Sequence, residues 1–272
     1  MKRIFPAFVM AIIVFATSCN NNTDTTANDS ATENDTKTAS TVANLSYNIV
    51  AAYPHDTSSF TEGLLIYNGQ LYEGTGNYGR SKLLQVDLQT GKPIRQVPLE
   101  EKYFGEGITI LHDTLYQLTW KEHVVFVYSL KDFKKIKEFP LNTEGWSITN
   151  DGTNLIVSDG SSNLYFYEPS TFRLLRTQGV TENGAPAINI NELEYINGYV
   201  YANQWQYNDI LKIDPNSGQV VGRLDFTDLV NRVKSKDPQA DVLNGIAYDA
   251  ATKKVYITGK LWPEIYEVRF PF

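Results

Sequence analysis

The sequence repeats one pattern five times, and this repeat constrains the fold more than any other feature. Each copy begins with an acid or an amide, runs as a strand, turns at a short polar pair and continues as a second strand. The copies start at Glu62, Glu106, Glu144, Asn191 and Asn244. The starts lie 44, 38, 47 and 53 residues apart, close to the period of a β-propeller blade.

Each of the first four copies continues with two more strands, such as residues 83–88 and 94–99 in the first. The fifth copy has only three strands before the chain ends. The segment Tyr47–Tyr53 is a suitable donor of the missing strand, and its pairing would leave no open sheet edge. We therefore predict an all-β fold, a five-bladed β-propeller whose N-terminal strand closes the last blade. A short helix is expected over residues 225–236.

The N-terminal region has the pattern of a secretion signal. Lys2 and Arg3 precede an apolar run over residues 4–16, which is too short to favour a transmembrane helix. The small residues that end at Cys19 resemble a bacterial lipobox. We predict a signal peptide over 1–18, a lipidated Cys19 with a disordered polar tether over 19–44, and the propeller over 45–272. An ordinary cleaved signal with a leftover thiol is the alternative.

These N-terminal features predict a membrane-anchored lipoprotein of the bacterial cell envelope that faces the periplasm. Cys19 is the only cysteine, so the chain has no internal disulfide. The 31 acidic residues exceed the 24 basic ones, which argues against nucleic acid and anionic lipid as partners. Membrane contact is expected only through the lipid anchor, and a monomer is the expected oligomeric state.

Aligning the five copies places the unusual residues in two columns. The first column is the set of residues that start the copies. The second lies at the end of the following strand, at Gly76, Trp120, Gly160, Trp205 and Lys260. Because neighbouring strands run antiparallel, both columns should meet at one mouth of the central channel. Trp146 lies two positions beyond Glu144 and should point the same way.

Such a mouth suits a small-molecule site, since aromatic walls would surround a few convergent polar groups. Three carboxylates this close cannot all ionise cheaply. At least one should therefore have a raised pKa and be able to move protons near neutral pH. The alternative is that these polar residues hold water and satisfy strand ends.

The motifs at these positions resemble one known family. They are Phe60-Thr61-Glu62-Gly63-Leu64, Tyr103-Phe104-Gly105-Glu106-Gly107, Glu144-Gly145-Trp146, residues 191–198, residues 242–247 and Thr258-Gly259-Lys260-Leu261-Trp262-Pro263. In these motifs, and over the whole domain, the chain resembles the plant and bacterial type of glutaminyl-peptide cyclotransferase. The resemblance implies a five-bladed propeller and an aminoacyltransferase activity. An N-terminal glutamine of a peptide or protein would be cyclised to pyroglutamate, and ammonia would be released.

The resemblance also implies roles for individual residues. Glu106 would be the catalytic proton shuttle, and Lys260 and Asn191 would act on the substrate carboxamide and its oxyanion. The substrate pocket would be lined by Phe60, Glu62, Trp120, Trp146 and Trp205. Glu62 stands where plant members carry glutamine, so it would bind the substrate ammonium or couple to Glu106. No role follows for Glu144 or Asn244.

No metal and no cofactor are expected, since His55, His112 and His123 lack zinc-ligand spacing. Two other functions stay open. The acid and amide column is a plausible set of calcium ligands, as in propeller lactonases. A propeller of this kind could also bind peptides or glycans without turning them over.

Overall fold

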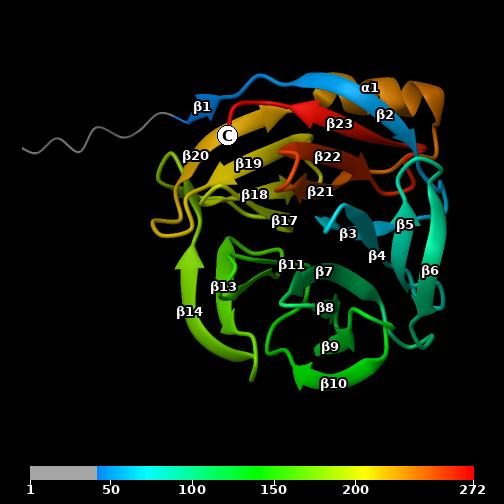
Figure 1. Cartoon of the computed structure of the whole chain (residues 1–272). Helices are drawn as coiled ribbons and strands as arrows, with labels where there is room; N and C mark the ends of the chain where they lie inside the picture. Colours follow the sequence, from blue (N-terminus) through cyan, green and yellow to red (C-terminus); the bar gives the residue numbers. More distant parts are fainter. Residues whose placement is uncertain (1–41) are drawn as a thin grey trace, which may run out of the picture. The chain divides into compact units, whose positions relative to one another are not determined.

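The computed structural model describes residues 42–272, which form five sheets around a common axis (Figure 1). The predicted signal peptide, Cys19 and nearly all of the predicted tether lie outside the described residues. Among residues 42–272 no helix is long and apolar enough to cross a membrane.

The first three blades are four-stranded meanders in chain order. Blade 1 holds β3 (Thr61–Tyr67), β4 (Gln70–Thr75), β5 (Lys82–Asp87) and β6 (Lys92–Pro98). Blade 2 holds β7 (Gly105–Leu111), β8 (Thr114–Thr119), β9 (Val124–Ser129) and β10 (Lys135–Pro140). Blade 3 holds β11 (Ser147–Asn150), β12 (Leu155–Ser158), β13 (Asn163–Glu168) and β14 (Arg173–Gly179).

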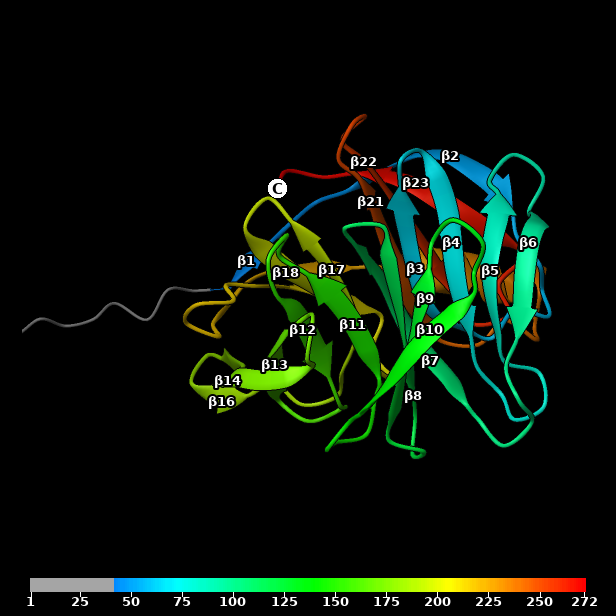
Figure 2. The ribbon, with the colours of Figure 1, turned by 60° about the horizontal axis from the view of Figure 1, so that its bottom comes forward.

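The last two blades include the N-terminal strands. Blade 4 holds β17 (Ile190–Ile196), β18 (Tyr199–Gln204), β19 (Asp209–Ile213) and β20 (Val220–Asp225), with β1 (Ala43–Asn44) added in parallel to β20. Blade 5 holds β21 (Leu243–Asp249), β22 (Lys254–Gly259), β23 (Glu264–Arg269) and β2 (Asn48–Pro54). The antiparallel pairing of β2 with β23 confirms the predicted closing strand. Figure 2 shows the blades from another side.

Two smaller elements complete the structure. A short hairpin of β15 (Thr181–Glu182) and β16 (Ala185–Pro186) follows blade 3. Helix α1 (Thr227–Lys236) lies between blades 4 and 5 in the chain and confirms the predicted helix. Its buried face, formed by Leu229, Val230 and Val233, joins the apolar core between those two blades.

One predicted boundary differs from the structure. The tether was expected to extend to residue 44, but Ala43 and Asn44 pair with Gly222 and Arg223 of β20. The Leu45 amide also donates to the Arg223 carbonyl at 2.8 Å. The outer edge of β20 has unpaired backbone groups, and pairing with a passing segment satisfies them whatever its composition.

The apolar core is divided among the five interfaces between neighbouring blades. The two-residue period of a strand explains this division. On β3, Leu64 packs toward blade 5 and Leu65 toward blade 2. Strands buried on both faces therefore read as nearly continuous apolar runs.

The turns follow from residue types that tolerate positive φ. Asn68 and Gly69 join β3 to β4 with φ of 51° and 72°, and Asn197 and Gly198 join β17 to β18 in the same way. Such two-residue turns match the twist of the strands that they connect.

Candidate active site

The two columns of residues meet at one end of the axis, as predicted. Six of the ten column residues line a cavity of about 390 Å³ there. Its lining includes every residue that was predicted to be catalytic or substrate-binding: Phe60, Glu62, Glu106, Trp120, Trp146, Asn191, Trp205 and Lys260. We call this cavity the cup.

Backbone bulges redirect the polar side chains at the start of the inner strands. The pairing register shifts at the start of four inner strands, next to Glu62, Glu106, Asn191 and Asn244. A bulge bends the strand and redirects the side chain at that point.

The glycines after Glu62 and Glu106 allow close approach between neighbouring inner strands. A Cβ on Gly63 would lie 2.5 Å from the Ile108 nitrogen, and one on Gly107 would lie 2.5 Å from the Ser147 Cα. The Glu-Gly pairs are therefore a local sequence signal of these positions.

Lys260 and Glu62 form a buried ion pair in the cup. The ammonium Nζ donates to Oε1 of Glu62 at 2.6 Å, and both side chains are almost fully enclosed. The same ammonium lies 4.4 Å from the centre of the Phe60 ring. A buried carboxylate that carries its own cation is well placed to stay ionised.

Glu106 lies beside this pair and differs from it in charge. Burial raises the pKa of Glu106 well above its usual range, and the negative charge of Glu62 raises it further. Burial also raises the pKa of Glu62, but Lys260 opposes that shift and Glu106 donates a hydrogen bond to Glu62. Glu62 has a direct ion pair with Lys260 and Glu106 does not, so Glu106 is the carboxyl group of the two that more readily holds a proton. The Lys260 charge lowers the pKa of Glu106, but burial and the Glu62 charge raise that pKa by more.

Asn191 is held by a chain of amides. Its Nδ2 donates to Oδ1 of Asn244 at 3.0 Å, and Asn244 Nδ2 donates to the Thr61 carbonyl at 2.9 Å. A carbonyl can only accept, so the orientation of both amides is fixed. Asn191 Oδ1 is buried and, within the described part of the chain, has no hydrogen-bond partner. An acceptor is therefore available at the cup.

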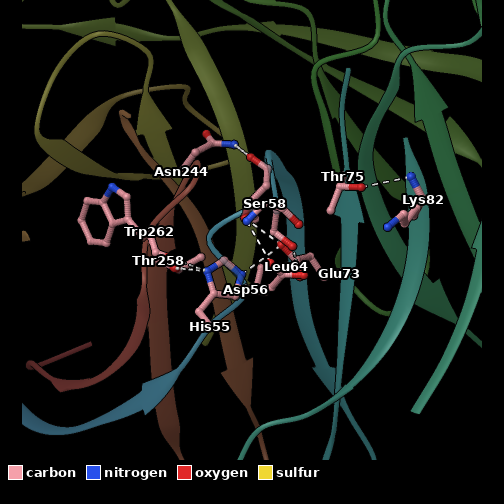
Figure 3. Close-up of polar contacts among 12 residues, drawn as sticks. His55, Asp56, Ser58, Leu64, Glu73, Thr75, Lys82, Asn244, Thr258 and Trp262 are labelled. Atoms are coloured by element: carbon pink, nitrogen blue, oxygen red, sulfur yellow. Dashed lines mark hydrogen bonds and ion pairs between the residues drawn. The ribbon is translucent and has the colours of Figure 1, made fainter. Parts of the chain in front are cut away.

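A second buried cluster surrounds His55 (Figure 3). His55 Nδ1 lies 2.8 Å from the Trp262 carbonyl, and its Nε2 lies 3.1 Å from Glu73. Thr61 Oγ1 donates to the same Glu73 oxygen at 2.7 Å. Burial alone would lower the pKa of His55, but the Glu73 charge and hydrogen bonds raise it overall. Both ring nitrogens face acceptors, which favours the protonated ring, and these contacts join the closing segment to blades 1 and 5.

Two residues of the first column do not expose polar atoms in the cup. Glu144 lies behind the aromatic wall, where it accepts from the indoles of Trp120 and Trp146. Asn244 is fully buried, and its amide group accepts from Asn191 and donates to the Thr61 carbonyl. The column is therefore not a converged set of calcium ligands. Residues 42–272 contain no cluster of three or more His, Cys, Asp or Glu side chains suited to a metal ion.

Five lining residues were missed from the sequence, namely Asn77, Phe104, Gln206, Asp241 and Val242. Phe104 could have been found, because it precedes Glu106 by two positions, as Phe60 precedes Glu62. Its ring packs edge-on against Trp120 at 5.5 Å. The other four lie in loops and carry no repeat signal.

The fold and the cup together define an enzyme-like propeller, in which a carboxyl group of raised pKa, an ion pair and an amide are enclosed by aromatic walls. The chain belongs to the glutamine cyclotransferase family, whose model matches residues 21–270. Both the predicted fold and the predicted family are confirmed.

Two relatives support this assignment. The chain is 41% identical over 224 residues to glutaminyl-peptide cyclotransferase of Arabidopsis thaliana, which covers 81% of this chain and 70% of the relative. It superposes on the crystal structure of Myxococcus xanthus glutaminyl cyclase with a TM-score of 0.79 and 36% identity. That match covers 84% of this chain and 98% of the other.

Proposed function

We propose that the cup cyclises the N-terminal glutamine of peptides or proteins to pyroglutamate. The α-amine bonds to the side-chain carboxamide carbon, the carbon–nitrogen bond of the carboxamide breaks, and ammonia leaves. The observation that supports this proposal most strongly is the neutral Glu106 beside the Glu62–Lys260 pair inside an aromatic wall. The names of the two relatives agree with it.

Glu106 acts as the proton shuttle. Its hydroxyl gives a proton to the leaving nitrogen, and its other oxygen receives one from the attacking amine. The residue ends as it began, neutral, and no net proton is consumed. The raised pKa keeps it in this form near neutral pH.

Lys260 and Asn191 orient the carboxamide between them. The Lys260 ammonium uses one donor on Glu62 and has others for the oxygen on which negative charge develops. Asn191 Oδ1 accepts from the carboxamide nitrogen, since its own amide nitrogen is bound to Asn244. We therefore assign the oxyanion to Lys260 and the nitrogen to Asn191.

The aromatic residues hold the substrate in a folded conformer. Trp146 and Trp205 meet edge to face at 5.6 Å, and Phe60 with Trp120 completes the wall. Because the attack is intramolecular, restricting the side chain to a reactive conformer removes much of the barrier.

The activity is tested by incubating the purified protein with a glutamine-initiated dipeptide and measuring ammonia and pyroglutamate. Stoichiometric appearance of both supports the proposal. Binding of the dipeptide without turnover would instead identify a binding propeller, and loss of turnover in a chelator would point to a metal-dependent enzyme.

The cellular placement is proposed on the sequence pattern alone. We propose that residues 1–18 are removed, that Cys19 is lipidated, and that the propeller faces the periplasm as a monomer on a polar tether. Membrane fractionation of cells that express wild type and Cys19→Ser tests this proposal. Release of the variant into the soluble fraction supports it, and unchanged fractionation contradicts it.

A further inference from the structure

Glu144 connects two walls of the cup from outside. One carboxylate oxygen, Oε2, accepts from the indole nitrogen of Trp120 at 2.9 Å and from that of Trp146 at 3.1 Å. The two tryptophans come from different blades, Trp120 at the end of β8 and Trp146 just before β11. A single charged acceptor therefore sets the orientation of two rings at once.

The contact of Glu144 with the two indoles determines which atoms of Trp120 and Trp146 face the cavity. Both rings line the cavity, whereas Glu144 does not. The indole N–H groups are consumed by Glu144, so the rings offer ring carbons rather than hydrogen-bond donors to a substrate. Polar groups of a substrate must then be satisfied by other lining residues, among them Glu106, Asn191 and Lys260.

Neighbouring residues hold the same arrangement. The Lys121 ammonium lies 3.9 Å from the centre of the Trp120 ring and 3.9 Å from Glu144 Oε1. Trp146 packs directly on Gly160, where a Cβ would lie 2.4 Å from the ring. Trp205 then meets Trp146 edge to face. The wall is thus fixed by one carboxylate, one cation over a ring and one glycine.

We propose that Glu144 is a positioning residue that fixes the aromatic wall and keeps both indole donors out of the cup. This inference rests on the proposed function for its kinetic consequence, although the effect on the rings does not depend on turnover. Without Glu144 the indoles rotate, and a free N–H competes with Lys260 for the carboxamide oxygen. The glutamine side chain then binds in orientations that do not react.

The test compares Glu144→Ala with Glu144→Gln. The alanine variant should lose about tenfold in kcat/KM for a glutamine-initiated dipeptide, as expected for loss of hydrogen bonds to a charged group. The glutamine variant keeps an acceptor oxygen and should recover most of that loss. The pH profile should keep its shape, because Glu144 does not contact Glu106.

Glu138→Ala is the matched control. Glu138 is also a half-exposed acid paired with a lysine, Lys135, but it lies on β10 away from the cup. This variant should behave as wild type. A loss in Glu144→Ala no larger than the loss in Glu138→Ala would overturn the proposal.

A second readout is independent of the reaction. Acrylamide quenching of tryptophan fluorescence, measured without substrate, should increase in Glu144→Ala and not in Glu138→Ala. If the wild type turned over no dipeptide, this measurement would still test the inference. Unchanged quenching in Glu144→Ala would show that the rings are held by packing alone, which contradicts the proposal.

Discussion

The inner strands of the propeller carry two pairs of glutamates that use their carboxyl groups in different ways. The cup pair, Glu62 and Glu106, contacts side chains, namely each other and Lys260. The second pair, Glu192 and Glu194 of β17, contacts mainly backbone. Glu192 accepts from the Leu64 and Ile246 amides at 3.2 and 2.9 Å, and Glu194 accepts from the Tyr248 amide at 2.7 Å.

The difference shows what a shifted pKa can and cannot indicate. Burial raises the pKa of Glu106 and of Glu192 well above the usual range, and it raises the pKa of Glu194 to about 8. The direction is the same in both pairs, so it does not mark the active site. The hydrogen-bond partners of the carboxyl groups distinguish the two pairs. Glu192 and Glu194 satisfy backbone amides on the inner edges of the blades, where no further strand pairs. Among residues 42–272 the cup pair has no such backbone partners, so its proton is available to a substrate.

The largest expected effect comes from Glu106→Gln. The amide cannot give up and recover a proton, so kcat/KM for a glutamine-initiated dipeptide should fall by about a hundredfold or more. Thermal unfolding should change little, because the amide keeps the shape of the side chain and Glu62 can still accept from it. Near-normal turnover in this variant would show that Glu106 is not the proton shuttle.

For Glu192→Ala we expect a loss of stability without a loss of activity. Loss of the carboxylate leaves the Leu64 and Ile246 amides without partners, and the free energy of unfolding should fall by about 2 kcal/mol. Turnover per folded molecule should match wild type. Urea unfolding followed by fluorescence measures the loss, and Glu192→Gln, which keeps one acceptor, should lose less. An alanine variant that is stable but inactive would contradict the assignment of a structural role to Glu192.

A smaller effect separates Glu62 from Glu106. The Glu62 charge raises the pKa of Glu106, so Glu62→Gln should lower that pKa while Lys260 stays cationic. Activity needs neutral Glu106, so the high-pH limb of the kcat/KM profile should move to lower pH. A profile that does not move would show that the two carboxyls are not coupled.

The smallest expected effect is on the pH dependence of the unfolding free energy, through Glu194. The pKa of Glu194 is raised from 4.5 to about 8, so this group favours the folded state below pH 4.5 and loses that contribution as pH rises to about 8. Glu194→Gln should therefore flatten the dependence of unfolding free energy on pH across that window. A slope equal to that of wild type would contradict the assignment.

Much of the fold could be predicted because its signal repeats. Five copies of one pattern, turn pairs such as Asn68-Gly69 and a last copy short of one strand predict the blades and the closing strand. The short strand β1 at Ala43 and Asn44 could not be predicted, since it forms only because β20 offers a free edge.

The cup could be predicted as a set of residues but not as a network. Strand direction brings Glu106, Asn191 and Lys260 to one mouth, whereas their partners depend on side-chain orientation. The pairing of Lys260 with Glu62, the fixed amide of Asn191 and the double contact of Glu144 all arise from residues distant in the chain. Glu192 carried no signal, because its backbone partners lie on other blades.

The protonation state of Glu106 in the free protein is the central claim, and carboxyl infrared spectroscopy measures it directly. The difference spectrum between wild type and Glu106→Gln at neutral pH should contain the stretching band of a protonated carboxylic acid. A difference spectrum with only carboxylate bands would show that Glu106 is ionised, and the neutral shuttle would be wrong.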